Sequence, residues 1–545
     1  MARARPGVID PPNRVGGHRL FVAVAATSVL GFLAVFFAWP VVAIIGLGVG
    51  GDLLGTFAEP STARLVGFTL GQAAASTVVA LLAGMPLAFV LARVALPGKA
   101  VIRALVTVPF VLPTIVVGMA FRAVFDVDGA ASSAVAIVLA NAFFNVAVVA
   151  RTVGGFWSHL DRRVEDSART LGASGLRAFR SVTLPALAPA IGSATAVVFL
   201  FCSTSFGVVL VLGGGSLRTL ETEIYLRTVE LLDLSGAAAL SLIQLSAVVT
   251  ALGLASFARK RRESALRLRR ADEAIRAPRG REWWVVGVAA SVLAALLTPI
   301  LGLLVRSVSG RNGWTFDGYR ALSGTGADGT LEVSGWEAVS QSLRTAADAT
   351  WIAMLLGLLA SIVLVSVRRR SAEAMDAALM LPLGVSAVTI GFGYLVTLHL
   401  LPGDLRTSPL LVPFAQALVV TPLVIRTVLP VLRAIDPRLR DAAATLGAGP
   451  WRVRSAIDLP LALRSVCAAA GFGFVVALGE FGATSFLARP DTATLPVVIA
   501  RLLSRPGESN LQMAYAACSL LMVVTALAVI AIESVRVRTH GVEEF

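Results

Sequence analysis

Apolar runs of about 20 residues or more, separated by short polar segments, repeat along the whole chain. A helix needs about 20 mostly apolar residues to cross a bilayer, whereas a run of about 10 to 14 is more typical of a buried core helix. The pattern therefore predicts an all-α polytopic membrane protein with about 12 transmembrane helices, six in each half. The predicted spans cover residues 20–47, 66–93, 101–121, 132–153, 187–213, 234–257, 284–307, 346–367, 375–400, 408–430, 462–487 and 512–533.

Polar segments mark the chain ends, the connection between the halves and one long loop in each half. The connection interleaves arginines with acidic residues, so we expect a solvated, helical tether. The expected organisation is an N-terminal tail (1–19), a first transmembrane domain (20–258) with a polar loop at 154–186, a linker (259–283), a second transmembrane domain (284–533) with a polar loop at 431–461, and a C-terminal tail (534–545).

The clusters of basic residues fall on one side of this arrangement. Lys and Arg in short loops stay on the cytoplasmic side of a membrane. If the two termini are cytoplasmic, the same side of the membrane holds both tails, both polar loops, the linker and the short loop with Arg93, Lys99 and Arg103. The loops on the opposite side include one with Asp126 and Asp128. We therefore expect a multi-pass protein of the bacterial cytoplasmic membrane with both termini inside.

Composition narrows the function classes. Of the residues, 56% are hydrophobic and 15% charged, and the net charge is +14. The arginines form short clusters between apolar runs instead of one basic domain, which argues against a nucleic-acid partner. The cysteines lie in apolar segments and the histidines are scattered, so neither a metal site nor a catalytic residue is predicted.

The two halves repeat one another at a constant separation. Gly172 and Gly447 lie 275 positions apart, and so do Pro185 and Pro460. Arg151-Thr152-Val153 and Thr219-Leu220 recur at the same separation, across several spans and loops. This register indicates an internal duplication, and halves of six spans each have the same orientation in the membrane.

The loop between the fourth and fifth spans of each half carries the most specific pattern, DSARTLGASGLRAFRSVTLP from Asp166 and DAAATLGAGPWRVRSAIDLP from Asp441. In the second copy, Asp436 before a proline predicts a helix N-cap, and Gly447 predicts a left-handed end after about ten residues. A second short helix is expected to begin near Pro450 and to end at Leu459-Pro460.

The first of these helices has one apolar face. Apolar or small residues at positions i, i+3, i+4 and i+7 form a flat stripe, which a membrane-surface helix could also show. A surface helix does not need the same acidic residue, glycine and Leu-Pro pair at equal spacing in both halves, so the membrane-surface interpretation is less favoured. The stripe consists of Leu439, Ala442, Ala443 and Leu446 in one copy and Val164, Ser167, Ala168 and Leu171 in the other.

These two segments resemble the EAA loop of bacterial binding-protein-dependent ABC importer permeases, in which Glu-Ala-Ala is followed by Gly and then by a Leu-Pro pair. Aspartate replaces the usual glutamate in both copies, and Ser167 replaces the first alanine of one. The resemblance covers nearly the whole chain. The matching residues are Asp166, Ser167, Ala168, Gly172, Leu184 and Pro185 in the first loop and Asp441, Ala442, Ala443, Gly447, Leu459 and Pro460 in the second.

The resemblance implies two tandem six-span permease domains whose loops each dock on one copy of a cytoplasmic ABC ATPase, so that two copies are bound. It also implies an extracytoplasmic solute-binding protein. No G-x-x-x-x-G-K-[ST] phosphate loop occurs in the sequence, so we expect ATP on the partner subunit, no cofactor on this chain and no enzymatic activity of its own.

Polar residues within a span are candidates for a solute path. Glu480 lies 275 positions after Ser205, and each precedes a Phe-Gly pair. Two interpretations remain open for this pair: both side chains line the translocation path, or both pack polar groups near the end of a span.

The fused two-half architecture resembles the thiamine and ferric iron permeases. Leu-Gly-Gly-Gly from Leu212, followed by Thr219-Leu220-Glu221 and Ile224-Tyr225, is similar to the thiamine type and favours it. The polar loops after the fifth spans are expected to form an outer gate or to contact the delivering protein. The main alternative is a secondary transporter with parallel six-span repeats, but it gives no reason for the paired loops. An intramembrane enzyme would need a metal cluster or a nucleophile motif, and the sequence contains neither.

Overall fold

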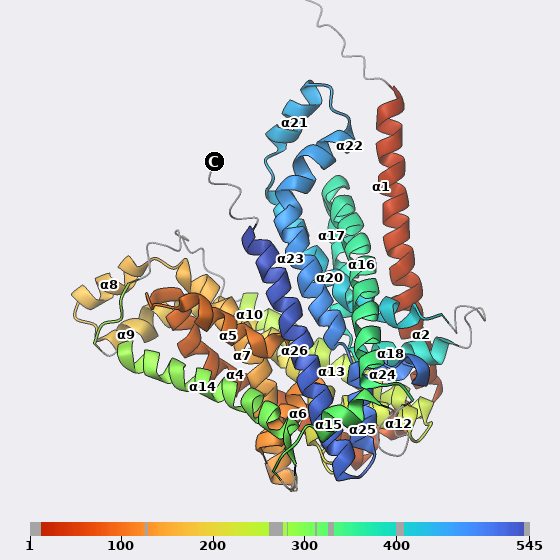
Figure 1. Cartoon of the computed structure of the whole chain (residues 1–545). Coiled ribbons are helices and arrows are strands. Elements are labelled where there is room, and N and C mark those ends of the chain that lie inside the picture. The colour runs from red at the N-terminus through yellow and green to blue at the C-terminus, as the bar shows by residue number, and fades with distance from the viewer. Residues whose placement is uncertain are drawn as a thin grey trace, which may run out of the picture.

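The computed structural model describes residues 12–125, 129–260, 276–280, 282–310, 313–324, 332–398 and 408–538, and in these ranges it is helical almost throughout (Figure 1). Nine helices within the described ranges are long and apolar enough to cross a membrane, or up to 11 if each of two bent helix pairs counts as one span. The helix α13 (Leu234–Lys260), whose apolar part is shorter, occupies the remaining predicted position. The structure thus shows the all-α polytopic fold.

The first half consists of helices of very different lengths. Its long helices lie at the predicted spans, and short helices lie in the loops between them. Its elements are α1 (Pro12–Leu33), a π-helical turn (Ala34–Ala38), α2 (Trp39–Gly50), α3 (Leu53–Ala58), α4 (Pro60–Arg93), α5 (Lys99–Val111), α6 (Thr114–Val124), α7 (Ala130–Ser158), α8 (Arg162–Thr170), α9 (Gly175–Ala178), a π-helical turn (Phe179–Thr183), α10 (Leu184–Ser203), α11 (Gly207–Leu212), α12 (Leu220–Val229) and α13.

The second half repeats this order and adds a two-stranded hairpin after its first helix. Its elements are α14 (Glu282–Ser307), β1 (Ser309–Gly310), β2 (Gly313–Trp314), α15 (Asp317–Ser323), α16 (Gly335–Ser366), α17 (Arg369–Met380), a 3₁₀ turn (Leu381–Gly384), α18 (Ala387–Thr397), α20 (Leu411–Ala434), α21 (Pro437–Thr445), α22 (Pro450–Val453), a π-helical turn (Arg454–Asp458), α23 (Leu459–Gly479), α24 (Thr484–Leu487), a 3₁₀ turn (Pro490–Thr492), α25 (Leu495–Ser504) and α26 (Glu508–Arg538).

The third span of each half is broken, whereas the hydrophobic pattern predicts a continuous helix. The helices α5 and α6 meet at an angle of 102°, and the equivalent pair in the second half, α17 with its 3₁₀ turn and α18, meets at 94°. Pro113 causes the first break, because a proline forces the preceding residue out of the helical conformation and Leu112 is extended. In the second half Ser386 caps the new helix by accepting from the Thr389 amide at 3.0 Å.

The fifth span of each half is also interrupted. The predicted spans 187–213 and 462–487 end as continuous helices at Ser203 and Gly479. A short non-helical break follows in each half, and the chain then forms α11 or α24. Both halves therefore carry two breaks, and these breaks position the polar and aromatic residues described below.

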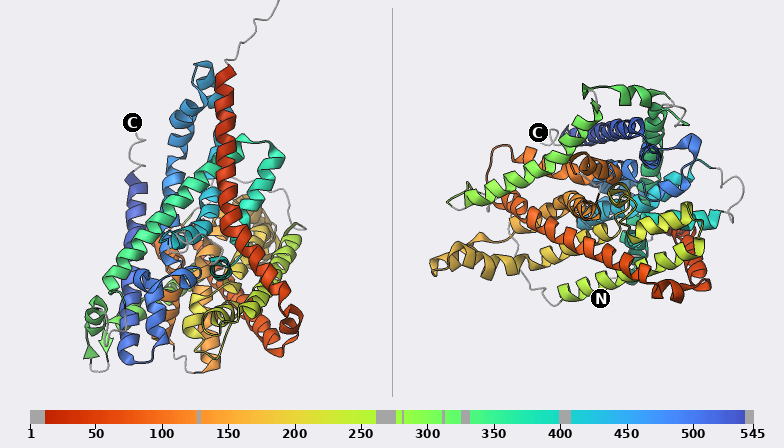
Figure 2. Two further views of the ribbon diagram at one scale, coloured as in Figure 1. Left: turned by 90° about the vertical axis from the view of Figure 1, so that its right-hand side faces the viewer. Right: turned by 90° about the horizontal axis from the view of Figure 1, so that it is seen from below.

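The first helix of each half packs against the opposite half (Figures 1 and 2). Ala25 and Val29 of α1 belong to a buried cluster with Ala360 of α16. The helix α14 packs against α4 and α6 of the first half, where Gly302 lies directly beside Val124. This exchange ties the two halves together over much of their length.

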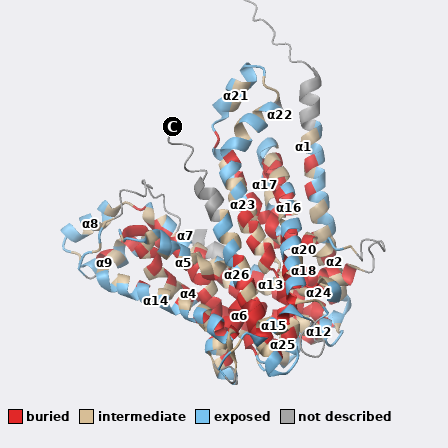
Figure 3. Cartoon of the chain, viewed as in Figure 1, coloured by how far each residue is buried: buried red, intermediate tan, exposed pale blue. Residues whose placement is uncertain are grey.

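The two halves meet at one end and diverge toward the other. Buried residues concentrate around α6, α13, α24 and α25 (Figure 3). The α8–α9 segment and the α21–α22 segment lie far apart at the ends of the diverging arms (Figure 1). The structure therefore has a closed end, where both fifth-span breaks meet, and an open end, where both polar loops lie.

Candidate functional site

The first helix of each polar loop begins and ends as the sequence predicts. The carboxylate of Asp436 accepts from the Arg438 amide at 2.9 Å, and Asp161 does the same for the Arg163 amide at 3.0 Å. At the other end Gly447 has a φ of +84° and Gly172 a φ of +89°. The Ala448 amide donates to the Ala443 carbonyl at 3.0 Å, the long bond that typically accompanies a left-handed C-terminal glycine.

The apolar stripe on these helices has no covering element within the described chain. Leu171 and Leu446, at equivalent positions, each expose 89% of their surface. Val164 and Leu439 are also exposed. Two large aliphatic side chains in water at the tip of a loop are unfavourable by about 1.5–3 kcal/mol each relative to a buried position, so this surface is suited to a protein partner.

Each loop is braced internally by polar contacts, and one pair of side chains occupies equivalent positions in the two loops. In the second loop the Arg440 guanidinium bonds the Asp458 carboxylate at 2.8 Å and donates to the Leu432 carbonyl at 3.0 Å. In the first loop the Thr183 hydroxyl donates to Glu165 at 3.2 Å. Sequence reasoning missed these contacts, although the equal separation of the two pairs could have revealed them.

The second helix of each loop does not end at its Leu-Pro pair, and the prediction of an end at Leu459-Pro460 was wrong. The helix α22 continues through a π-helical turn into α23, and the first loop does the same around Leu184-Pro185. Proline removes one amide donor and crowds the preceding turn, and a π turn accommodates both effects by widening the helix locally. A single continuous helix therefore connects each loop to its fifth span.

The first loop also contacts the start of the second half. Glu282 of α14 lies 2.8 Å from Arg276 and 3.6 Å from Arg162. The Ala95 amide donates to the Arg276 carbonyl at 2.8 Å, so the end of the linker is docked rather than a solvated helix. Burial, with repulsion from Arg276, lowers the pKa of Arg162. Residues 261–275 and 281 of the predicted linker lie outside the described residues.

The second loop contacts the first helix of the first half in a comparable way. The rings of Phe21 and Trp451 meet edge to face with centroids 4.5 Å apart. The Arg454 guanidinium lies 5.5 Å from the Phe21 ring and 5.8 Å from the Trp451 ring. Each polar loop is thus held by the exchanged first helix of the opposite half.

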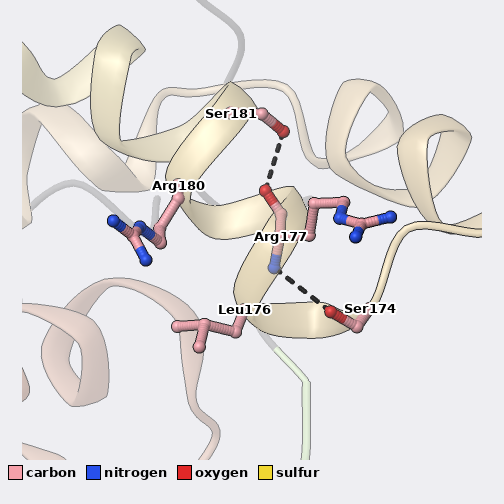
Figure 4. Close-up of a pocket in the computed structure, with 5 residues that line it drawn as sticks. All are labelled: Ser174, Leu176, Arg177, Arg180 and Ser181. Atoms are coloured by element: carbon pink, nitrogen blue, oxygen red, sulfur yellow. Dashed lines mark hydrogen bonds between the residues drawn. The ribbon is translucent and has the colours of Figure 1, made fainter.

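A shallow pocket of about 420 Å³ lies beside α9 in the first loop (Figure 4). Ser174 caps the helix by accepting from the Arg177 amide at 3.4 Å, and Ser181 donates to the Arg177 carbonyl at 2.7 Å. Arg177 and Arg180 contribute guanidinium groups to its wall. The pocket is therefore a basic recess in the first polar loop.

The two predicted path residues each bond within their own half. Glu480 accepts from the Ala483 amide at 2.8 Å, the Thr484 amide at 3.1 Å and the Thr484 hydroxyl at 2.6 Å, and so caps α24. Ser205 donates to Asn141 at 2.7 Å. Because both side chains are satisfied inside their halves, the contacts favour the packing interpretation over the path interpretation.

The in-span amides help to hold these breaks. Asn141 donates to Gln72 at 2.9 Å, and Gln72 donates to the Cys202 carbonyl at 2.7 Å, which ties the end of α10 to α4 and α7. In the second half Gln416 donates to the Thr484 hydroxyl at 3.2 Å. Asn141 and Gln416 occupy equivalent positions, so both halves use an amide at the same place.

The phenylalanines next to the predicted path residues meet across the interface between the halves. The rings of Phe206 and Phe481 stack with centroids 5.2 Å apart. Equivalent residues of two repeats touch each other only on the pseudo-twofold axis that relates them. Parallel repeats place this axis along the membrane normal. The glycine that follows each ring allows close packing, because a Cβ on Gly207 would lie 2.5 Å from the Thr114 hydroxyl and one on Gly482 would lie 2.8 Å from Ala387.

Comparison with known proteins identifies the family. The family model described as "Binding-protein-dependent transport system inner membrane component" matches the chain twice, over residues 80–263 and 353–538. The chain is 26% identical over 469 residues to the thiamine transport system permease protein ThiP of Brucella abortus (strain 2308), covering 82% of each chain. It is 24% identical over 516 residues to ThiP of Escherichia coli (strain K12), covering 91% of this chain and 92% of that one.

A shorter relative matches only part of the chain. The molybdate/tungstate transport system permease protein WtpB of Thermococcus kodakarensis is 34% identical over 183 residues, which is 33% of this chain and 73% of that protein. The double match of the family model confirms the internal duplication and decides against a secondary transporter. The chain belongs to the family of inner-membrane permease components of binding-protein-dependent transport systems, with two permease units in tandem.

Proposed function

We propose that this chain forms the translocation path of an ATP-driven thiamine importer and that each polar loop seats in one of two copies of an ABC ATPase. The exposed, equivalent leucines Leu171 and Leu446 carry this proposal. They present the same apolar contact on the two diverging arms, as two identical partner subunits would require.

The loop residues then have distinct roles. The small residues Ser167 and Ala168, and Ala442 and Ala443, keep the docking face flat. Gly172 and Gly447 end each docking helix, and the continuous helices through Leu184-Pro185 and Leu459-Pro460 carry movement into the fifth spans. ATP would be bound and hydrolysed on the partner subunits, and this chain would bind no cofactor.

Thiamine is favoured over ferric iron as the solute because thiamine permeases match the chain over most of its length. An extracytoplasmic binding protein would deliver it at the closed end of the structure. Both termini would lie in the cytoplasm, which is supported by the position of Phe21 beside the second polar loop.

Purification of the tagged chain from its own membranes tests the proposal. We expect an ABC ATPase and a solute-binding protein to copurify, and vesicles containing the complex to take up labelled thiamine only with ATP. Variants with Leu171→Asp and Leu446→Asp should lose the ATPase, whereas Leu54→Asp, at an exposed leucine in the short helix α3 between two spans, serves as a matched control outside the loops. Retention of the ATPase by the double Asp variant would refute the docking role, and uptake of molybdate in place of thiamine would refute the solute.

A further inference from the structure

The closed end of the structure contains a second buried carboxylate, Glu221 of α12, whose surroundings differ from those of Glu480. Glu221 has no exposed surface. It accepts from the Gln244 side chain of its own half and from the Ser386 hydroxyl of the other half at 2.9 Å. No Lys or Arg forms an ion pair with it in the described part of the chain.

The structural role that explains a buried carboxylate at Glu480 does not apply to Glu221. Glu480 accepts from two backbone amides and closes a helix end, whereas Glu221 accepts only from side chains. The position equivalent to Glu221 in the second half is Pro496, so the duplicated fold does not need a carboxylate there. A buried ionisable residue that lacks a cationic partner is unfavourable unless another group pairs with it.

An unused acceptor lies next to this carboxylate. The Gln244 amide donates its nitrogen to Glu221, and its oxygen is buried with no partner among the described residues. Most buried polar atoms in proteins are hydrogen-bonded, so an unpaired one calls for an explanation. Glu221 and Gln244 together offer acceptors, and Glu221 adds a negative charge when a cation beside it keeps the carboxylate ionised, so the pair suits a ligand with N–H donors and a positive charge.

Aromatic rings from both halves meet beside Tyr225 of the same helix as Glu221. Tyr225 lies one helical turn after Glu221 on α12, and its ring is 5.3 Å from Phe206 and 5.5 Å from Phe486. Phe206 stacks on Phe481 across the axis. The faces of such rings attract organic cations and repel anions.

We infer that Glu221, the Gln244 carbonyl and the axial rings of Phe206, Tyr225, Phe481 and Phe486 form a recognition site for a planar organic cation with N–H donors. The site is closed here because Ser386 and the stacked rings occupy it. Separation of the halves at this end would free Glu221 from Ser386 and part the rings. This inference rests on the proposed import of thiamine, which is such a cation, and names the residues that would select it.

The test uses the permease reconstituted with its ATPase and binding protein, and measures both labelled thiamine uptake and ATP hydrolysis. Glu221→Gln keeps the shape and can still accept from Gln244, while its amide nitrogen would donate to the Ser386 hydroxyl instead of accepting from it. The variant mainly removes the charge, so thiamine delivered per ATP should fall about tenfold or more. The matched control is Glu223→Gln on the same helix, whose partners are Arg218 and Arg227 and which should retain the wild-type ratio.

Two further variants separate recognition from packing. Ser386→Ala removes the bond between the halves and the cap of α18 but leaves the charge of Glu221, so the ratio of thiamine to ATP should stay closer to wild type than in Glu221→Gln. Tyr225→Leu should lower the ratio, whereas Tyr225→Phe, which keeps the ring, should not. These variants remain informative if Glu221→Gln fails to insert in the membrane.

The outcomes distinguish this inference from the proposed function. If the wild type imports thiamine, the proposed function stands. The recognition site would then be overturned by an unchanged ratio of thiamine to ATP in Glu221→Gln, or by an equal loss of this ratio in Ser386→Ala. Wild-type import of a different organic cation, with the same loss in Glu221→Gln, would overturn thiamine and support the site. Wild-type import of an anion would overturn both.

Discussion

Alanine at Gly447 should weaken the transmission of movement from the ATPase to the membrane helices. The glycine has a φ of +84°, and a Cβ built there would have no atom within 4 Å. The substitution therefore adds backbone strain without a steric clash. An L-residue with a side chain in this left-handed conformation costs about 1–2 kcal/mol, which shifts the balance between the ordered and disordered turn by a factor of about 5–30.

The same reasoning applies to Gly172, whose φ is +89° and whose Cβ position is also open. The two loops lie far apart, so the effects of Gly172→Ala and Gly447→Ala on turn stability should add. Thiamine uptake per ATP hydrolysed, measured in vesicles containing the whole complex, should fall in each single variant and further in the double variant. Thermal unfolding of the membrane region should not change.

Gly449→Ala is the matched control, because this glycine lies in the same loop with open space and without a left-handed φ. Gly447→Asn should have a smaller effect than Gly447→Ala, because Asn tolerates the left-handed region better than other residues with a side chain. Wild-type uptake per ATP in the double alanine variant would refute the reasoning, as would an equal loss in Gly449→Ala.

Three further predictions concern stability and docking. Gly84→Ala and Gly357→Ala should each lower the free energy of unfolding by about 1–3 kcal/mol, and with it the melting temperature, because their Cβ atoms would lie 2.6 Å from Val149 and 2.5 Å from Val424. Gly71→Ala on the same helix as Gly84 has open space at its Cβ and should be neutral. Glu480→Gln should lower the melting temperature, because Gln cannot accept all three hydrogen bonds of the carboxylate, but it should leave uptake per ATP unchanged. A loss of uptake per ATP without a loss of stability would restore the path interpretation. Arg440→Gln should weaken ATPase binding at the second loop by loosening its bond to Asp458, and ATPase affinity equal to that of wild type would contradict this.

Local signals in the sequence predicted the docking helices well. The N-cap at Asp436 and the left-handed end at Gly447 depend on a few neighbouring residues, so both are confirmed. The same local rule failed at Pro460, because the tertiary structure continues the helix through a π turn where an isolated peptide would end it.

The breaks in the membrane spans were harder to predict, because an apolar run has the same hydropathy whether its helix is straight or sharply bent. Pro113 lies within the predicted span 101–121 and could have indicated its break. The contact between Phe206 and Phe481 is a long-range one. The repeat separation makes these residues equivalent, but only the packing of the halves shows that they meet.

The continuous helix from Trp451 to Gly479 explains how the two parts of the site act together. It has 29 residues and is therefore about 40 Å long. One end carries the docking loop, and the other end stops one residue before Glu480 and two before the axial Phe481. Because a helix transmits displacement as a rigid rod, inward movement of the two docking loops would tilt both fifth spans and change the contact between Phe206 and Phe481.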